Sequence, residues 1–192
     1  VHGAGGAVGT AFLQLGKLMN LEVYGTAGKS KQELILELGG IPIDYKSEDF
    51  VEVIKNKEPE GIDAVFDSIG GAYYGRSLKT LNKKGTLVAF GSYNAVTKVD
   101  LIKDFLKINL WSFIPWMPKT TFYSIGSWHK NNLNWFKEDL QTLFKLLEEG
   151  KIKPSIGRIM NLKDVVLAHE LIEKAQVKGK IVLEVNKENG AQ

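Results

Sequence analysis

Apolar residues recur along the chain at two alternating periods. A stripe at helical spacing follows the opening VHGAGG, made of Val8, Phe12, Leu15 and Met19. The next run, LEVYGT, is short and β-rich, as expected of a strand. Helix-like and strand-like stretches then alternate as far as Trp116.

This alternation predicts an α/β fold of the Rossmann type, with a doubly wound, six-stranded, mainly parallel sheet and helices on both faces. The predicted strands cover residues 1–2, 21–26, 41–45, 62–66, 85–93 and 109–116. The predicted helices cover residues 8–19, 29–38, 47–56, 72–81 and 99–108. Beyond them, residues 117–132 show no regular period, helical patterns cover 133–149 and 164–175, and a strand pattern covers 178–185.

Composition excludes several classes of protein. The chain has 192 residues and a net charge of +3, and its 25 basic residues are scattered among 22 acidic ones. No basic block stands out, so we expect neither a nucleic-acid partner nor a membrane surface. Cysteine is absent, which rules out disulfides and thiolate metal sites within these residues. No apolar run reaches membrane-spanning length and no signal peptide precedes the first strand, so a cytoplasmic location is expected.

The glycine-rich opening is the first candidate site. A strand, a glycine turn and a helix form the arrangement in which a dinucleotide pyrophosphate binds free backbone N–H groups at a helix N-terminus. Gly5 and Gly6 would let the backbone approach the phosphates, and Gly9 would let the helix lie close to the strand. The glycines fall at three-residue steps instead of the strict G-x-G-x-x-G, so a turn that serves packing alone is the alternative.

The end of the second strand indicates which dinucleotide would bind. An NAD site places Asp or Glu there, whereas this chain has GTAGKSK and its first carboxylate is Glu33, inside the helix. Thr26, Ser30 and the two lysines Lys29 and Lys31 offer donors and positive charge that suit a 2′-phosphate. NADP(H) is therefore the predicted cofactor. A solvated helix start is the alternative interpretation of the lysines, although lysine at a helix N-terminus opposes the macrodipole.

Motifs along nearly the whole chain resemble one enzyme family. They are HGAGGAVG, YGTAGKSK, PIDYKSEDF, DAVFDSIGG, LVAFGSYN and AHELIEKAQVKGKIVL. In this order they are similar to the medium-chain dehydrogenases/reductases, in the zinc-independent quinone oxidoreductase (zeta-crystallin-like) branch. The resemblance implies an NADP(H)-binding Rossmann domain over residues 1–151. It also implies that a GroES-like domain precedes Val1 and that residues 152–192 pack on it. The chain would then be a C-terminal fragment.

The resemblance also implies which residues bind the cofactor. The glycine loop, with Gly5, Gly6, Ala7 and Val8, would hold the pyrophosphate, while Lys31 and Tyr45, together with Thr26, would hold the 2′-phosphate side. The remaining cofactor residues would follow the fourth, fifth and sixth strands: Ser68; Phe90, Gly91, Ser92 and Tyr93; and Phe113 and Ile114. Tyr45 as a surface aromatic, Ser68 in a simple turn and Tyr93 in loop packing are the alternatives. No metal ligand and no catalytic residue is assigned.

The expected function is transfer of hydride from NADPH to a quinone, enone or similar activated carbonyl or alkene, with a small molecule as substrate. A zinc-dependent alcohol dehydrogenase and a non-catalytic NADPH-binding structural or sensor protein are the alternatives. Relatives of this kind pair their sixth strands across a dimer, so we expect a homodimer through LWSFIPW. The strand around Lys180–Val185 is expected to lack its partner in this chain.

Overall fold

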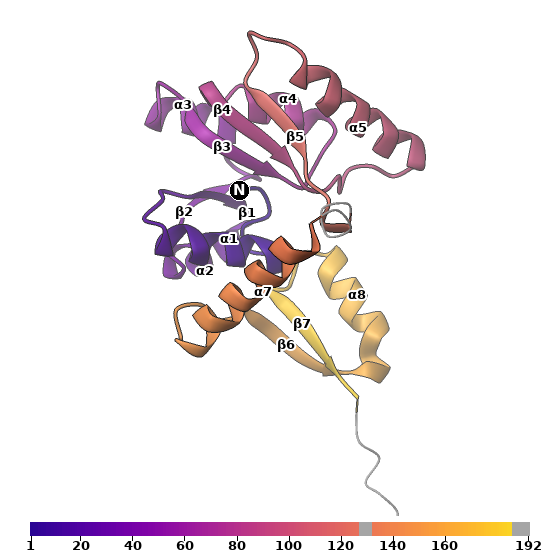
Figure 1. Ribbon diagram of the computed structural model, residues 1–192. Helices are drawn as coiled ribbons and strands as arrows, with labels where there is room; N and C mark the ends of the chain where they lie inside the picture. The colour runs from indigo at the N-terminus through magenta and orange to yellow at the C-terminus, as the bar shows by residue number, and fades with distance from the viewer. Residues whose placement is uncertain (127–131, 186–192) are drawn as a thin grey trace, which may run out of the picture.

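The computed structural model describes residues 1–126 and 132–185 (Figure 1). In chain order the elements are α1 (Ala7–Leu18), β1 (Tyr24–Ala27), the 3₁₀ turn η1 (Lys29–Lys31), α2 (Gln32–Glu37), β2 (Ile41–Asp44), α3 (Phe50–Lys57), β3 (Ile62–Asp67), α4 (Ala72–Leu78), β4 (Leu81–Ala89), α5 (Lys98–Ser112), β5 (Lys119–Phe122), α7 (Leu133–Glu148), β6 (Ile156–Asn161), the 3₁₀ turn η2 (Leu162–Asp164), α8 (Val165–Glu173) and β7 (Lys180–Glu184). Every strand pair within these ranges is parallel. The α/β class is therefore confirmed.

The predicted single sheet of six strands is wrong in its count. The strands form separate sheets with the orders β1-β2, β3-β4-β5 and β6-β7. The opening segment lies between the first two: His2 bridges Thr26 of β1, and its N–H donates to the carbonyl of Phe66 in β3 over 3.0 Å. Gly3 has φ +68°, so the backbone leaves the extended conformation after two residues and no full strand forms.

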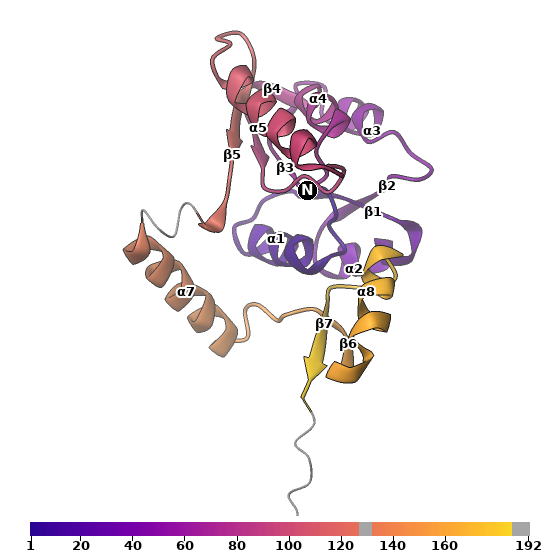
Figure 2. The same ribbon diagram turned by 90° about the vertical axis from the view of Figure 1, so that its right-hand side faces the viewer.

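A cavity of about 600 Å³ separates β1 from β3 beside this segment. Side chains of α1 and α3 line it on either side, among them Phe12, Leu15, Met19, Phe50 and Ile54. Asp63 and Ala64 of β3 are exposed, although β3 pairs with β4 under the helices. The opening segment therefore links the two sheets: Val1, His2 and Ala4 hydrogen-bond to β1, and the N–H of His2 bonds to β3. In Figure 2 this segment lies between β1 and β3.

Helices cover both faces of these sheets, as predicted. On one face Leu13 of α1 and Ile35 of α2 pack with Ala27 of β1. On the other face Tyr74 of α4 and Ile108 of α5 pack on β3 and β4. Each of these side chains is at most 4% exposed, and full burial of a leucine or isoleucine stabilises a fold by about 1.5–3 kcal/mol. The core therefore holds the carboxyl ends of the parallel strands in place.

The sixth strand is not where the pattern placed it. Residues 98–112 form α5, which begins with a capping box between Thr97 and Asp100, and Phe113 is its C-cap residue. The strand that pairs with β4 is β5, inside the stretch predicted to be irregular. The run LWSFIPW is rich in apolar and aromatic residues, but its first part continues the helix, where Trp111 lies 4.8 Å from Lys107 one turn earlier.

The C-terminal part forms a smaller unit around β6, β7 and α8 (Figure 1). Here β7 pairs with β6 over Ile156–Asn161, so the expectation that this strand lacks a partner is wrong. The helix predicted over 133–149 is confirmed as α7, which contributes no buried side chain and lies to one side of α1 (Figure 2). Part of the predicted irregular stretch and the end of the predicted C-terminal segment lie outside the described residues. Within the described ranges, no helix is both long and apolar enough to cross a bilayer.

Candidate functional site

The glycine loop closes tightly onto the first helix. The N–H of Gly6 donates to the carbonyl of Gly3 over 2.9 Å, and Gly6 is the N-cap of α1. A Cβ at Gly9 would lie 2.4 Å from both Ala4 Cα and the Gly3 carbonyl oxygen, a separation that no side chain tolerates. Only glycine lets the helix pack this close to the loop, as the sequence predicted.

The start of α1 has the electrostatics of an anion site. Its first turn, which includes Ala7 and Val8, carries no acidic side chain. The first N–H groups of a helix have no intrahelical partner, and the aligned peptide dipoles place partial positive charge there. A phosphate at this point would accept hydrogen bonds from those N–H groups. The loop carbonyls of Gly3 and Gly5 accept from Gly6 and Gly179 instead.

Lys31 lies against the glycine loop. Its methylene groups pack over Gly5, where an added Cβ would come within 2.6 Å of Lys31 Cδ. Burial lowers the pKa of Lys31, since the half-buried ammonium has lost part of its hydration. A bound phosphate would replace that hydration. The structure therefore brings the predicted lysine and the predicted pyrophosphate loop together.

Two side chains from the end of β2 face the same place. Tyr45 Cε1 and Lys46 Cε each lie 3.9 Å from the position a Cβ would take at Gly28, just after β1. Tyr45 was predicted, whereas Lys46 was missed. The signal for Lys46 was its position next to Tyr45 at a strand end, where parallel strands present their carboxyl edges. Lys31, Tyr45 and Lys46 thus all follow the carboxyl ends of β1 and β2, Lys31 against Gly5 and the other two near Gly28.

Thr26 points away from this group. Its hydroxyl lies 2.9 Å from His2 Nδ1, in a buried chain of polar side chains. His2 Nε2 lies 3.0 Å from Ser77 Oγ, which donates to Asp67 Oδ2 over 2.8 Å. Since the Ser77 proton goes to Asp67, Ser77 accepts from Nε2–H, and Nδ1 accepts the Thr26 proton. We assign His2 as the neutral Nε2–H tautomer on this pattern.

The four hydrogen-bonded side chains Thr26, His2, Ser77 and Asp67 are called here the His2 network. Burial sets their charge states. It lowers the pKa of His2 to about 3 and raises the pKa of Asp67. His2 and Asp67 are 4% and 0% exposed, and the hydrogen bonds of the network occupy both ring nitrogens of His2 and Oδ2 of Asp67. Serine, histidine and aspartate do meet here, but as a structural link between β1, β3 and α4, and not as a nucleophile and its base.

The turns after β3 and β4 support each other. The N–H of Tyr93 donates to the carbonyl of Ser68 over 2.9 Å, and the hydroxyl of Tyr74 donates to the carbonyl of Gly91 over 2.6 Å. Asp104 of α5 accepts from the N–H of Gly71 over 3.0 Å and from the hydroxyl of Ser92. Ser68 and residues 90–93 therefore lie together at the carboxyl edge of the sheet. Asp104 was missed, because it lies inside a helix without a motif.

Phe113 and Ile114 lie away from these residues. They follow the C-terminus of α5, and a helix that connects parallel strands runs opposite to them. Their place is therefore at the amino edge of the sheet, and Phe113 is 81% exposed. Their assignment to a strand is therefore wrong, and their contact with a nicotinamide stays a prediction. At the carboxyl end of β5 the N–H of Tyr123 donates to the Ala89 carbonyl over 2.8 Å, so this end lies beside the end of β4.

The described residues do not fit a metal centre. Residues 1–126 and 132–185 contain no group of three or more His, Cys, Asp or Glu side chains that could hold a metal ion. The glycine loop and the group at the ends of β1 and β2 fit a phosphorylated dinucleotide, through backbone N–H groups and lysine ammoniums. These residues can bind and orient a phosphorylated group.

The profile of the zinc-binding dehydrogenase family matches residues 40–183. A synaptic vesicle membrane protein VAT-1 homolog of Danio rerio is 30% identical over 194 residues, covering 95% of this chain and 40% of that protein. A probable quinone oxidoreductase of Schizosaccharomyces pombe is 30% identical over 190 residues, covering 98% of this chain and 55% of that protein. The quinone oxidoreductase of Escherichia coli, solved in complex with NADPH, superposes with a TM-score of 0.77 at 29% identity, covering 94% of this chain and 55% of that one. The chain thus spans about half the length of these relatives.

Proposed function

The chain belongs to the zinc-binding dehydrogenase family, in the quinone oxidoreductase-like part of the medium-chain dehydrogenase/reductase superfamily, and from this premise we propose that it is an NADPH-dependent oxidoreductase. Its substrate would be a quinone, enone or similar activated carbonyl or alkene. The contact that carries the proposal is Lys31 packed on Gly5, which puts a cation beside the pyrophosphate loop. The NADPH bound to the Escherichia coli relative supports the cofactor assignment.

The roles proposed for the residues follow from their positions. The N–H groups at the start of α1 hold the pyrophosphate, and Lys31 with Tyr45 holds the 2′-phosphate. Ser68 and residues 90–93 line the path from the ribose toward the nicotinamide. When bound, the cofactor supplies a hydride, and reduction of a quinone to a hydroquinone takes that hydride and a proton from the medium. The chain's own part is to bind and orient.

The test is oxidation of NADPH in the presence of 1,4-benzoquinone or an α,β-unsaturated ketone, followed as loss of NADPH absorbance. We expect turnover with NADPH and little with NADH. NADPH binding without turnover of any acceptor would replace this proposal by a non-catalytic binding protein. Activity with an alcohol and NADP⁺ that a zinc chelator abolishes would replace it by a zinc-dependent alcohol dehydrogenase.

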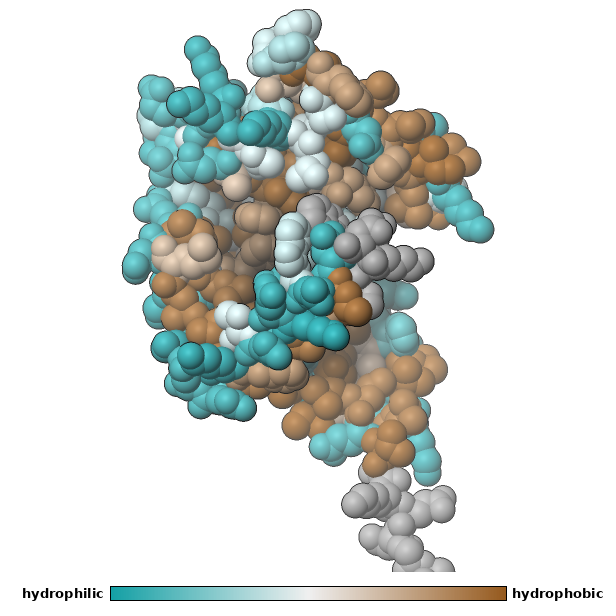
Figure 3. Space-filling model, in the orientation of Figure 1, coloured by the Kyte–Doolittle hydropathy of each residue, from teal (hydrophilic) through white to brown (hydrophobic). Residues whose placement is uncertain are grey.

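We also propose a homodimer, with β5 at its centre in place of the predicted sixth strand. Within the described ranges β5 pairs only with β4, so its outer edge is unpaired. The adjacent α5 exposes a band of apolar side chains, seen as the brown area over this helix in Figure 3: Val99, Leu101, Ile102, Phe105, Leu106 and Leu110. An unpaired edge beside a continuous apolar face suits a two-fold interface.

Replacing Leu106 and Leu110 together by glutamate is expected to convert the dimer into a monomer, because charges would be buried without partners. Sedimentation equilibrium would show a mass of 21.3 kDa in place of twice that value. The matched control is Val166→Glu on α8, which is 69% exposed and should leave the dimer intact. A dimer that survives the α5 substitutions, or a wild-type monomer, contradicts the proposed interface.

The division of the chain also stays a proposal. Residues 1–151 would form the cofactor domain, and residues 152–192 would pack on a GroES-like domain. The parallel pairing of β6 with β7 makes the second part a unit with its own small sheet. A cytoplasmic location, expected from the sequence, is likewise a proposal.

A further inference from the structure

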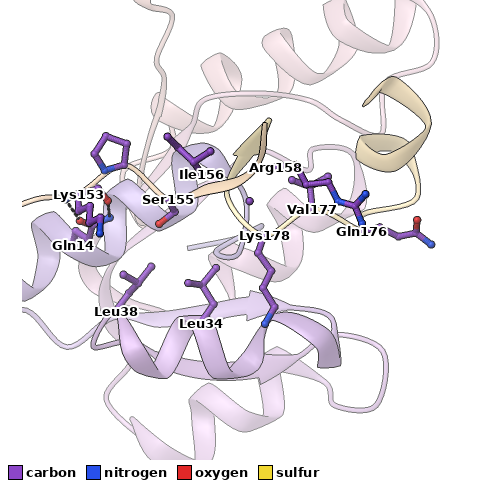
Figure 4. A pocket seen from close by; sticks show the side chains of 12 residues that line it. Gln14, Leu34, Leu38, Lys153, Ser155, Ile156, Arg158, Gln176, Val177 and Lys178 are labelled. Atoms are coloured by element: carbon purple, nitrogen blue, oxygen red, sulfur yellow. Dashed lines mark hydrogen bonds between the residues drawn. The ribbon is translucent and has the colours of Figure 1, made fainter. Parts of the chain in front are cut away.

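A second cleft lies between α1 and α2 on one side and the segments that lead into β6 and β7 on the other, and Gly179 connects it to the glycine loop (Figure 4). Its volume is about 610 Å³, within the range of about 300–1,000 Å³ typical of small-molecule sites. None of the residues predicted to bind the cofactor lines it. The proposed function leaves this cleft without a role.

Hydrogen bonds fix the walls of the cleft. The amide of Gln14 donates to the carbonyl of Lys153 over 2.9 Å and accepts from its N–H over 2.6 Å. The N–H of Gly179 donates to the carbonyl of Gly5, and that of Lys180 to the carbonyl of Ser155, each over 2.9 Å. Lys153 and Gly179, which precede β6 and β7, therefore attach the C-terminal unit to α1 and to the glycine loop. The cleft is preformed in this arrangement, which lowers the entropic cost of filling it.

The lining combines positive charge with an apolar floor. Lys153, Arg158 and Lys178 are the charged residues among the twelve that line the cleft, which include no carboxylate. The carboxylate of Glu33, outside the lining, lies 3.9 Å from Lys178 Nζ and is 79% exposed. In Figure 4 Leu34 and Leu38 project from α2 into the cleft toward the strand that carries Ile156. Cations at the rim over aliphatic side chains suit a ligand with an anionic head and an aliphatic tail.

We propose that this cleft binds a small amphiphilic anion. Its carboxylate or phosphate head pairs with Arg158, since a guanidinium presents parallel N–H donors to either group. Its aliphatic tail lies along Leu34 and Leu38, where burial of each methylene contributes about 0.8 kcal/mol. Because Gly179 joins the cleft wall to Gly5, an occupied cleft also holds the C-terminal unit against the glycine loop.

The test is isothermal titration of the 192-residue chain with laurate, dodecyl phosphate and dodecanol below their micelle concentrations. Laurate and dodecyl phosphate are expected to bind with a stoichiometry of one, and dodecanol at least about tenfold more weakly, as the loss of a charge-assisted hydrogen bond implies. The tighter of the two anions identifies the head group. Arg158→Gln is expected to weaken anion binding about tenfold or more, and Leu34→Ser to weaken laurate but not acetate. Lys163→Gln, which removes an exposed charge on η2, is the matched control and should change nothing.

Other results would overturn the proposal. Equal affinity for dodecanol and laurate, or laurate binding unchanged in Arg158→Gln, would mean nonspecific apolar adsorption. Displacement of laurate by NADPH in simple competition would make the cleft part of the cofactor site. Thermal melts of each variant, close to that of the wild type, show that the comparison is made on folded protein. Since laurate binding is measured without NADPH, failure here leaves the proposed oxidoreductase function untouched.

Discussion

Replacing Lys31 with alanine is expected to raise the dissociation constant for NADPH by about 10- to 100-fold and to leave that for NADH unchanged. A hydrogen bond to a charged group contributes about 1.5–3 kcal/mol, and the half-buried ammonium of Lys31 lies where solvent screening is reduced. NADH lacks the 2′-phosphate and so loses no contact. Fluorescence titration of both dinucleotides measures the two constants on the same protein.

Lys29→Ala is the matched control for this prediction. Lys29 begins the same 3₁₀ turn and is exposed, and the three atoms nearest to the Cβ position at Gly5 all belong to Lys31. We expect it to change NADPH affinity by less than about threefold, as is typical of exposed ion pairs. The opposite result, with NADPH binding lost in Lys29→Ala and retained in Lys31→Ala, would move the phosphate to the start of the turn.

Acidification from pH 6.5 to pH 4 is expected to lower the free energy of unfolding by about 3 kcal/mol through His2. Burial lowers the pKa of His2 to about 3 in the folded chain, whereas the pKa of a histidine in an unfolded chain is about 6.5. Below pH 6.5 the unfolded state therefore binds the extra proton. The stability present above that pH is lost as the pH falls toward 3, at up to about 1.4 kcal/mol per unit.

Urea unfolding at a series of pH values, compared between the wild type and His2→Gln, measures the contribution of His2. The comparison is needed because the raised pKa of buried Asp67 gives a slope of the opposite sign in the same window. Should His2→Gln fail to fold, the NMR titration of the His2 ring in the wild type tests the same point. A ring that protonates above pH 5 in the folded protein contradicts the assigned network.

Much of the cofactor half could be predicted because its signals are local. The glycine at position 9 and the apolar stripe behind it specify a close helix, and a steric contact of 2.4 Å at Gly9 is the structural result. Lys31 was predicted to bind the cofactor from its local sequence, because a strand end without a carboxylate next to a lysine-rich turn indicates an anion, and the structure places its side chain against Gly5. Both inferences needed only residues adjacent in sequence.

Features that depend on distant residues were missed. Thr26 sits at a strand end and was expected to face the cofactor, but His2 and Ser77, far apart in sequence, draw its hydroxyl into the interior. The error at Phe113 has another cause: an aromatic, apolar run satisfies both a strand and a helix, and in the structure α5 continues through Ser112. The strand itself, around Thr120, is short and polar, and packing under α5 stabilises it more than its own pattern.

The measurement closest to the central claim is a thermal shift of the unmodified chain with NADPH and, separately, with NADH. At a hundredfold excess over the dissociation constant, a ligand that binds only the folded state stabilises it by about 2.7 kcal/mol. For a chain of this size that corresponds to a rise in Tm of about 5–10 °C. We predict this rise with NADPH and a markedly smaller one with NADH at the same concentration. Equal shifts with both dinucleotides, or none with either, would contradict the assignment of the glycine loop and Lys31 as an NADPH site.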